Sequence, residues 1–292
     1  MLILIISKKD QFSNNILSYL LSNNILINEH SEKEYIFYDF CFNQNNELCK
    51  AVVVNDFLYL TNLDVDYFEA KFNTECEFLI ISSHKSEKQK IDIISIHLCG
   101  NFNKNELGGE ERSFSIAYLN AFEFVYNQLI NAKLPDNLIF NVEATHHGPS
   151  LKRQVLYYEI GPDDKAYNNK EYLAFYLKIL FEFIKTNYHY KKTPIILIGS
   201  PHYLDKQLLK SIETKLKEKY NLQNITFSHI LPKYSINDLL TLTDNDLELI
   251  FMKLLTASQT DLVVLNKDYM KSLTRISSIF EKINKERANY II

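Results

Sequence analysis

The chain alternates short, continuous apolar runs with longer amphipathic segments. Residues 2–6 are typical of a buried strand, because the run is short, uninterrupted and rich in β-branched side chains. Similar runs predict further strands at residues 35–40, 51–54, 78–82, 91–98, 138–142, 156–160, 194–198 and 225–230, and an edge strand at 262–265.

Amphipathic segments separate these strands and predict helices. Apolar side chains recur at Ile16 and Leu20, so we expect a helix that ends near residue 22, with Ser13 as its N-cap. Ser113 or Ser115 is expected to cap a second helix that runs to about residue 131. Further helices are predicted at residues 169–187, 205–220, 244–257 and 268–287.

The order of these elements indicates the fold class. Strands separated by helices of about ten or more residues imply βαβ units and a largely parallel sheet with helices on both faces. No Pro/Gly-rich linker and no internal repeat divides the sequence. We therefore predict one α/β domain over residues 1–292, a three-layer α/β/α arrangement with insertions around a mixed, mostly parallel sheet.

Composition and charge narrow the class of protein. Hydrophobic residues make up 46% and charged residues 23%, the balance of an ordinary globular protein with a real core. The net charge of −4 argues against a general DNA- or RNA-binding protein, although a local basic patch can still face one RNA end. The first apolar run is too short for a secretory signal, and no later stretch is long enough to cross a bilayer. We expect a cytoplasmic protein that does not enter a membrane.

Candidate chemistry is concentrated where three predicted strands end. In open α/β sheets, ligands bind beyond the carboxyl ends of the strands, and glycine there allows close backbone approach. His97 is followed by Gly100, the strand at 138–142 is followed by residues 143–149, and Gly199 is followed by His202. We expect the three segments to converge, so that Glu143, His97, His146, His147 and His202 line one cavity.

The segment 143–149 reads Glu143-Ala144-Thr145-His146-His147-Gly148-Pro149 and has too many polar groups for a core position. One histidine is predicted to activate water or bind a metal, while Glu143 orients it or acts as acid or base. A hydrogen-bonded polar loop is the alternative. Histidines elsewhere can have a structural role in place of a functional one. For His97 the structural role is favoured, and for His202 and His229 both interpretations stay open.

At these residues the chain resembles the archaeal-type D-aminoacyl-tRNA deacylases, a family shared with plants. The block from Glu143 to Pro149 is the most specific part of the resemblance. The chain departs from the usual family sequence at three places. Cys99 stands where the family usually has proline, Ser200 where it usually has another glycine, and Tyr167 near the place of a usual tryptophan. These changes leave the imidazoles and the acid intact. The matching blocks keep their order and span most of residues 80–234. They are Ser82-Ser83-His84-Lys85-Ser86, His97-x-x-Gly100-Asn101, Leu107-Gly108-Gly109, the 143–149 segment, Glu159-Ile160-Gly161, Gly199-x-x-His202-Tyr203 and His229-Ile230-x-Pro232-Lys233-Tyr234.

The resemblance implies hydrolysis of the ester that joins a D-amino acid to tRNA, zinc dependence, and a fold shared with nucleoside phosphorylases and peptidyl-tRNA hydrolases. Aminoacyl-tRNA is then the substrate, with no DNA, membrane or obligate protein partner. Catalytic roles are expected for Glu143, His146, His147 and His202. Of these, Glu143, His146 and His202 are candidate zinc ligands by residue type. Substrate contacts are expected from His84, His97, Gly100, Asn101, Gly108, Gly109, Thr145, Gly148 and Tyr203. Backbone N–H groups of the four glycines are candidate oxyanion donors.

Two other functions stay open from the sequence. A small-molecule hydrolase or phosphorylase of related fold would act on a peptide or nucleoside without any tRNA. A non-catalytic RNA-binding module is disfavoured by the acidic net charge and by the histidines at strand ends.

Overall fold

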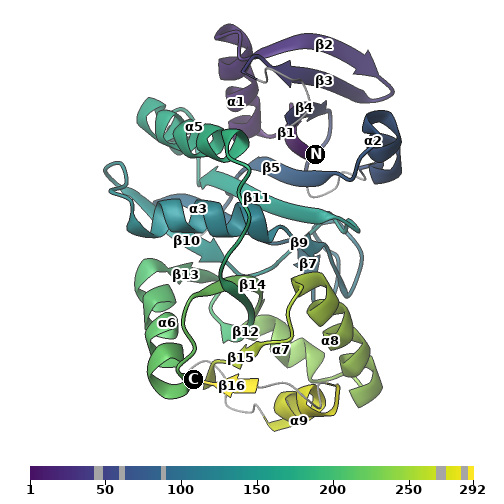
Figure 1. Cartoon of the computed structure of the whole chain (residues 1–292), viewed down its shortest axis with the longest axis vertical. Helices are drawn as coiled ribbons and strands as arrows, with labels where there is room; N and C mark the ends of the chain where they lie inside the picture. Colours follow the sequence, from purple (N-terminus) through teal and green to yellow (C-terminus); the bar gives the residue numbers. More distant parts are fainter. Residues whose placement is uncertain (43–48, 59–62, 87–89, 268–273, 284–288) are drawn as a thin grey trace.

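The computed structural model describes residues 1–42, 49–58, 63–86, 90–267, 274–283 and 289–292 (Figure 1). Its larger sheet contains β1 (Leu2–Ser7), β2 (Leu26–Glu32), β3 (Tyr35–Phe40), β4 (Cys49–Val54), β5 (Glu77–Ser83), β6 (Asp92–His97), β9 (Ile116–Ala117), β10 (Leu138–Glu143), β11 (Gln154–Gly161) and β13 (Tyr203–Asp205). The strand order is β13-β10-β6-β11-β5-β1-β4-β3-β2, with β9 paired to β11. The central pairs β1–β4, β1–β5, β5–β11 and β6–β10 are parallel, whereas β6–β11 and the two ends are antiparallel.

Helices cover both faces of this sheet. They are α1 (Gln11–Ser22), α2 (Val65–Phe72), α3 (Leu119–Asn131), α4 (Asp164–Tyr167) and α5 (Lys170–Lys185). Alternate residues of a strand point to opposite faces: Leu4 belongs to the core that contains the apolar sides of α1, α3 and α5, whereas Ile5 packs in a second core with Phe68 of α2. The predicted three-layer arrangement with a mixed, mostly parallel sheet is confirmed.

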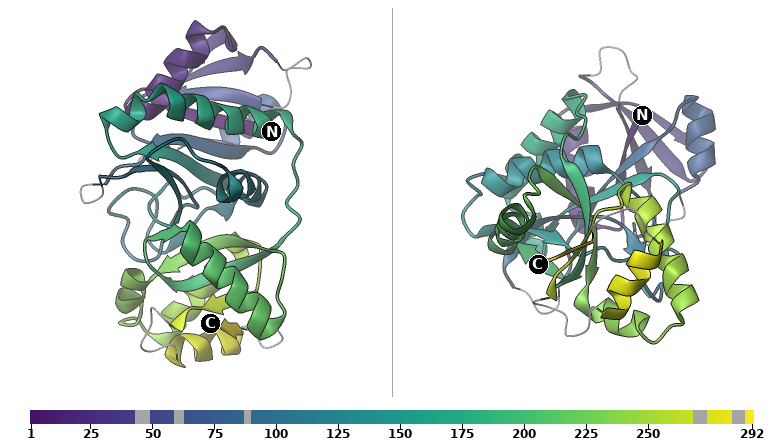
Figure 2. Two further views of the ribbon diagram at one scale, coloured as in Figure 1. Left: turned by 90° about the vertical axis from the view of Figure 1, so that its left-hand side faces the viewer. Right: turned by 60° about the horizontal axis from the view of Figure 1, so that its bottom comes forward.

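A smaller, all-parallel sheet lies against the β10–β13 end of the larger one (Figures 1 and 2). It has the order β14-β12-β15-β16, with β12 (Thr193–Ser200), β14 (Ile225–Pro232), β15 (Val263–Leu265) and β16 (Asn289–Ile291). Its helices are α6 (Lys206–Tyr220), α7 (Lys233–Leu239), α8 (Asp244–Ser258) and α9 (Thr274–Ile283).

One apolar core joins the two sheets. Ile195 of β12 and Phe227 of β14 share the core of α3 and the larger sheet, while Ile196 and Ile198 face Phe251 of α8. That continuity favours the interpretation of the chain as one domain, which stays a prediction. Among the residues described, no helix is long and apolar enough to cross a membrane.

Several predicted boundaries differ from the structure. Asp10, not Ser13, caps α1, because its carboxylate accepts the Ser13 N–H at 2.9 Å. Ser113 and Ser115 do not cap α3, which begins at Leu119. Ser113 instead starts β8 (Ser113–Phe114), which pairs with β7 (Gly100–Asn101), and the Ser115 hydroxyl donates to Pro149 O.

Two further predictions concern the C-terminal part. The strand predicted at an edge, β15, lies between β12 and β16. Of the helix predicted over residues 268–287, the structure has residues 274–283 as α9, and residues 268–273 and 284–288 lie outside the described residues.

Candidate active site

The segment after β10 bridges the two sheets. Glu143 ends β10, and the next two residues leave the larger sheet. Ala144 N donates to His202 O at 2.8 Å, and Thr145 N donates to Ile230 O of β14 at 2.9 Å. The start of the 143–149 segment is therefore fixed by the backbones of two chain segments that are distant from it in sequence.

Four imidazoles gather around this bridge, as the sequence predicted. The ring centroid of His146 lies 4.2 Å from that of His97, 4.3 Å from that of His147 and 4.7 Å from that of His202. The His97 ring stacks on Tyr157 of β11, with centroids 4.7 Å apart. His97 is fully buried and does not itself line a cavity, whereas the other three rings are partly exposed.

Two buried carboxylates contact the histidines. Glu143 Oε1 lies 3.0 Å from His84 Nδ1, and Glu143 Oε2 lies 3.2 Å from His202 Nε2. Glu159 on β11 lies 3.7 Å from both His84 Nδ1 and His97 Nε2. No role was predicted for Glu159 from the sequence. The signal was available, because an acid inside an otherwise apolar strand needs a buried partner.

These contacts set the charge states of His84 and Glu143. Burial lowers the pKa of His84, but the adjacent Glu143 and Glu159 carboxylates outweigh burial and raise that pKa to about 10. Burial raises the pKa of Glu143, but hydrogen bonds with His202 and His84 outweigh it and hold that pKa well below its usual range. At neutral pH the site therefore contains an imidazolium at His84 and a carboxylate at Glu143.

The paired histidines behave differently. Burial, with repulsion from a charged His97, lowers the pKa of His147 to about 4 and that of His146 well below its usual range. His146 Nδ1 lies 2.8 Å from Ala144 O, and His147 Nδ1 lies 2.7 Å from Gly148 O. A carbonyl oxygen only accepts hydrogen bonds, so each neutral ring carries its proton on Nδ1 and its lone pair on Nε2.

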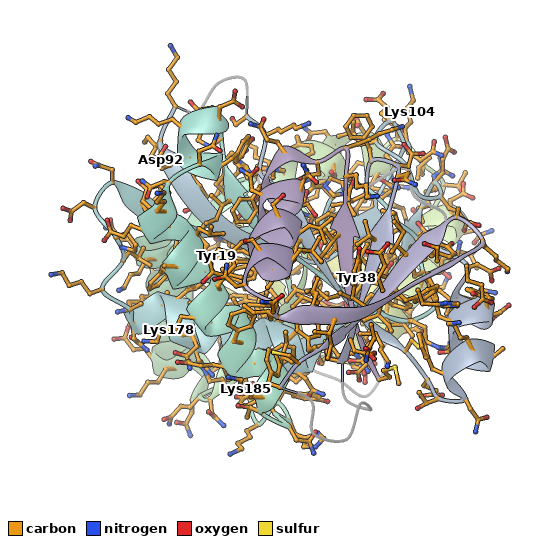
Figure 3. All side chains as sticks on the ribbon, turned by 90° about the horizontal axis from the view of Figure 1, so that it is seen from above. Tyr19, Tyr38, Asp92, Lys104, Lys178 and Lys185 are labelled. Carbon is orange, nitrogen blue, oxygen red and sulfur yellow. The ribbon has the colours of Figure 1, made fainter. Side chains whose placement is uncertain are left out.

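The paired histidines form a wall between two cavities. The smaller has a volume of about 330 Å³ and is lined by side chains that include Phe57, Leu58, His84, Glu143, His202 and Tyr203. The larger has a volume of about 570 Å³ and is lined by residues that include Asn101, Lys104, Arg112, Thr145 and Tyr234. His146, His147 and Leu107 line both cavities. In the view of Figure 3, Lys104 lies at the rim of the molecule, away from Lys178 and Lys185.

Comparison with known proteins matches this arrangement to one family. The family profile described as D-aminoacyl-tRNA deacylase matches residues 72–288, which include both cavities' histidines and both buried acids. The chain belongs to this family. The D-aminoacyl-tRNA deacylase of Thermococcus onnurineus is 31% identical over 182 residues, covering 62% of this chain and 62% of the relative. The D-aminoacyl-tRNA deacylase of Pyrococcus horikoshii is 27% identical over 241 residues, covering 80% of this chain and 81% of the relative.

A solved structure shows the same fold. The crystal structure of a conserved protein of unknown function, AF0625, aligns with a TM-score of 0.77 and 19% identity, covering all of this chain and 94% of that one. Since the alignment spans both sheets, the larger and smaller sheets occur together in that protein as well.

In this deacylase, the glycines predicted as oxyanion donors have another use. Gly100 N already donates to His147 O at 2.9 Å, Gly108 N to Asn105 O at 3.1 Å, and Gly148 N to Leu107 O at 3.3 Å. These bonds argue against an oxyanion role for the three N–H groups. A Cβ on Gly148 would lie 2.4 Å from Gly109 N, so the absence of a side chain lets two loops meet beside the paired histidines.

Two other predicted contact residues, Asn101 and Thr145, line the larger cavity and also hold backbone in place. Asn101 Nδ2 donates to Gly108 O at 2.8 Å, and Thr145 Oγ1 accepts from Ile230 N at 3.0 Å. Tyr203 lines the smaller cavity. His229 is buried beside Ser258 Oγ at 2.9 Å and lines neither cavity, which favours the structural interpretation of this residue.

The deacylase site also contains groups of potential metal ligands. Three groups have donor atoms within 4.8 Å of one another: His97, His146 and His147; Glu143, His146 and His202; and His84, Glu143 and Glu159. The second group is the predicted zinc set. The residues of the third group are all buried, and both of its carboxylates already contact His84.

Proposed function

We propose that this deacylase hydrolyses the ester bond between a D-amino acid and tRNA in the cytoplasm, releasing the free D-amino acid and tRNA. The observation that carries the proposal is the wall of neutral imidazoles between two cavities, flanked by a carboxylate and an imidazolium. Such a reaction would remove D-amino acids that have been wrongly attached to tRNA. Membership of the D-aminoacyl-tRNA deacylase family supports the choice of substrate.

The two cavities suit the two halves of the ester. The smaller one has aromatic and aliphatic walls at Phe57, Leu58 and Tyr203 and suits an aminoacyl side chain. The larger one, with Tyr234 and the cations Lys104 and Arg112, suits the terminal nucleoside of tRNA and its phosphate. The ester carbonyl would then lie at the His146–His147 wall.

Ester hydrolysis requires an activated water molecule and stabilisation of a developing oxyanion. The Nε2 lone pair of each neutral ring, His146 and His147, can accept a proton from water or bind a metal ion, but not both at once. Glu143 positions His202 through its 3.2 Å contact and keeps His84 protonated. His84 lines the smaller cavity with an Nε2 that has no hydrogen-bond partner among the described residues, and this cationic donor can stabilise the oxyanion in place of the Gly100, Gly108 and Gly148 N–H groups.

Zinc is the proposed cofactor, and the residues present fit it. Imidazole nitrogen and carboxylate oxygen are both common zinc ligands. His146 would bind the ion together with either Glu143 and His202 or His97 and His147. When bound in such a site, zinc supplies Lewis acidity toward a carbonyl oxygen or a water molecule.

The test compares hydrolysis of D-tyrosyl-tRNA and L-tyrosyl-tRNA, each with and without a zinc chelator. We expect rapid release of D-tyrosine, little release of L-tyrosine and a loss of rate with the chelator that added zinc restores. A D-tyrosine ester without tRNA is the third substrate. Equal turnover of that ester would favour a small-molecule hydrolase, and binding of tRNA without any hydrolysis would favour an RNA-binding module.

A further inference from the structure

Three imidazoles in this protein share a hydrogen-bonding arrangement that is typical of metal ligands. A histidine that binds zinc almost always donates its other ring N–H to a carbonyl or carboxylate, which fixes the ring orientation and the tautomer. His146 and His147 contact backbone carbonyls through Nδ1 at 2.8 and 2.7 Å, and His97 Nδ1 lies 3.3 Å from Leu98 O. In His146 and His147, Nε2 is therefore the nitrogen that carries the lone pair, and in His97 a zinc ion would displace the Nε2 proton and bind at the same atom.

The Nε2 atom of His97 needs a partner. The His97 side chain is completely buried, and within the part of the chain that the structure describes its Nε2 has no hydrogen bond. Glu159 Oε1, at 3.7 Å, is beyond hydrogen-bond distance. A buried polar atom without a partner is rare in native proteins, and a bound ion is one way in which such an atom is satisfied.

Glu143 Oε2 and His202 Nε2, atoms of the predicted ligands, are in a different situation, because they already contact each other. Glu143 Oε2 and His202 Nε2 lie 3.2 Å apart, and His202 Nδ1 lies 3.0 Å from Tyr234 Oη. Zinc bound by this pair would break their mutual contact. Zinc bound by the three other imidazoles would leave it intact.

We propose that His97, His146 and His147 form a three-imidazole zinc site through their Nε2 atoms, and that Glu143, His84, Glu159 and His202 form a separate network beside it. Two nitrogens bound to one tetrahedral zinc ion lie about 3.3 Å apart. The three residues have donor atoms within 4.8 Å of one another, so each ring would move by roughly 1 Å to close on the ion. Three protein ligands leave a fourth position open, as in catalytic zinc sites.

A catalytic use of this zinc site depends on the proposed function, because two of its three ligands, His146 and His147, line both cavities. Its occupancy, however, can be measured without any turnover. Binding of zinc without hydrolysis would reject the proposed function alone. Hydrolysis by a parent protein that binds no zinc would reject the metal site alone.

The first experiment measures zinc affinity by competition with a chelator. Parent, His97→Gln and His147→Gln proteins are compared with the matched variants Glu143→Gln and His202→Gln. We expect the first two substitutions to weaken zinc binding at least about 100-fold, and the two control substitutions to weaken it less than about tenfold. A parent that binds no zinc, or control variants that lose as much affinity as His97→Gln, would overturn the proposal.

The second experiment uses only the parent protein, so it does not depend on whether a variant folds. Cobalt(II) replaces zinc, and paramagnetically shifted proton resonances that disappear in D₂O are counted. Because each of the three rings keeps a proton on Nδ1, we expect one such resonance for each of His97, His146 and His147. The set Glu143, His146 and His202 has only two imidazoles, and a spectrum with two signals would exclude the three-imidazole site.

Discussion

A methyl group added at Gly148 should damage catalysis more than stability. The Cβ of Gly148→Ala would lie 2.4 Å from Gly109 N and 2.7 Å from Gly108 C, whereas ordinary contact begins at 3.4 Å. Both atoms belong to backbone, so the two loops must separate by about 1 Å. A displacement of that size at a reacting group reduces rate roughly 100-fold, or about 2.7 kcal/mol in barrier height. Overpacking should lower the free energy of unfolding by about 1–3 kcal/mol.

The assay is kcat/KM for D-tyrosyl-tRNA, with thermal unfolding and zinc content measured on the same samples. Gly100→Ala is the matched control: its Cβ would lie 2.5 Å from Phe114 Cδ1, a ring atom that can rotate away, and its nearest backbone atoms lie at 3.2 Å instead of 2.4 Å, so we expect a loss of less than about tenfold. If Gly148→Ala is folded and retains parental kcat/KM, the close contact between the two loops does not position His147, and the reasoning is refuted.

Three other substitutions test separate parts of the structure. His146→Ala should abolish D-aminoacyl ester hydrolysis in a protein with unchanged circular dichroism; near-normal turnover would remove His146 from the mechanism. Tyr234→Phe removes the 3.0 Å contact with His202 Nδ1 and should lower kcat about tenfold, whereas the unfolding temperature should shift by only a few degrees, because one hydrogen bond contributes about 1 kcal/mol. Burial lowers the pKa of His229 to about 4 from 6.5, so between these pH values the unfolded chain binds a proton that the folded protein does not. The free energy of unfolding should therefore fall by about 3 kcal/mol as the pH drops from 6.5 to about 4. When the free energy of unfolding is measured with urea, His229→Asn should lose less of it over this pH range than the parent or the exposed control His189→Asn. Equal losses in all three proteins would show that His229 does not cause the pH dependence.

Much of the fold could be predicted from the sequence because the strands are continuous apolar runs. The strand β3 has the predicted bounds, and β1, β6 and β10 differ from prediction by one residue at an end. The sequence did not reveal β2, whose residues are mostly exposed, because an exposed strand lacks an apolar pattern. The two short strands β8 and β9 were mistaken for the start of α3, since serines before an amphipathic helix are common caps.

The membership of the site could be predicted better than its connections. Histidines at strand ends indicated which residues gather, because carboxyl ends of parallel strands meet at one edge. The sequence could not show that β12 belongs to a second sheet, or that β13 returns His202 to the first one. It also could not separate His84, which is charged, from His147, which is neutral, because the difference arises from the Glu143 and Glu159 contacts.

The bridge formed by residues 143–145 affects how this protein loses activity. Its backbone is bonded on one side to His202 and on the other to Ile230 of β14, so the relative position of the imidazoles depends on the docking of the two halves. Partial denaturation that loosens this junction would disperse the reactive groups while each half keeps its helices. Turnover should therefore be lost at a lower urea concentration than the helical ellipticity, so the loss of activity would measure the separation of the two halves.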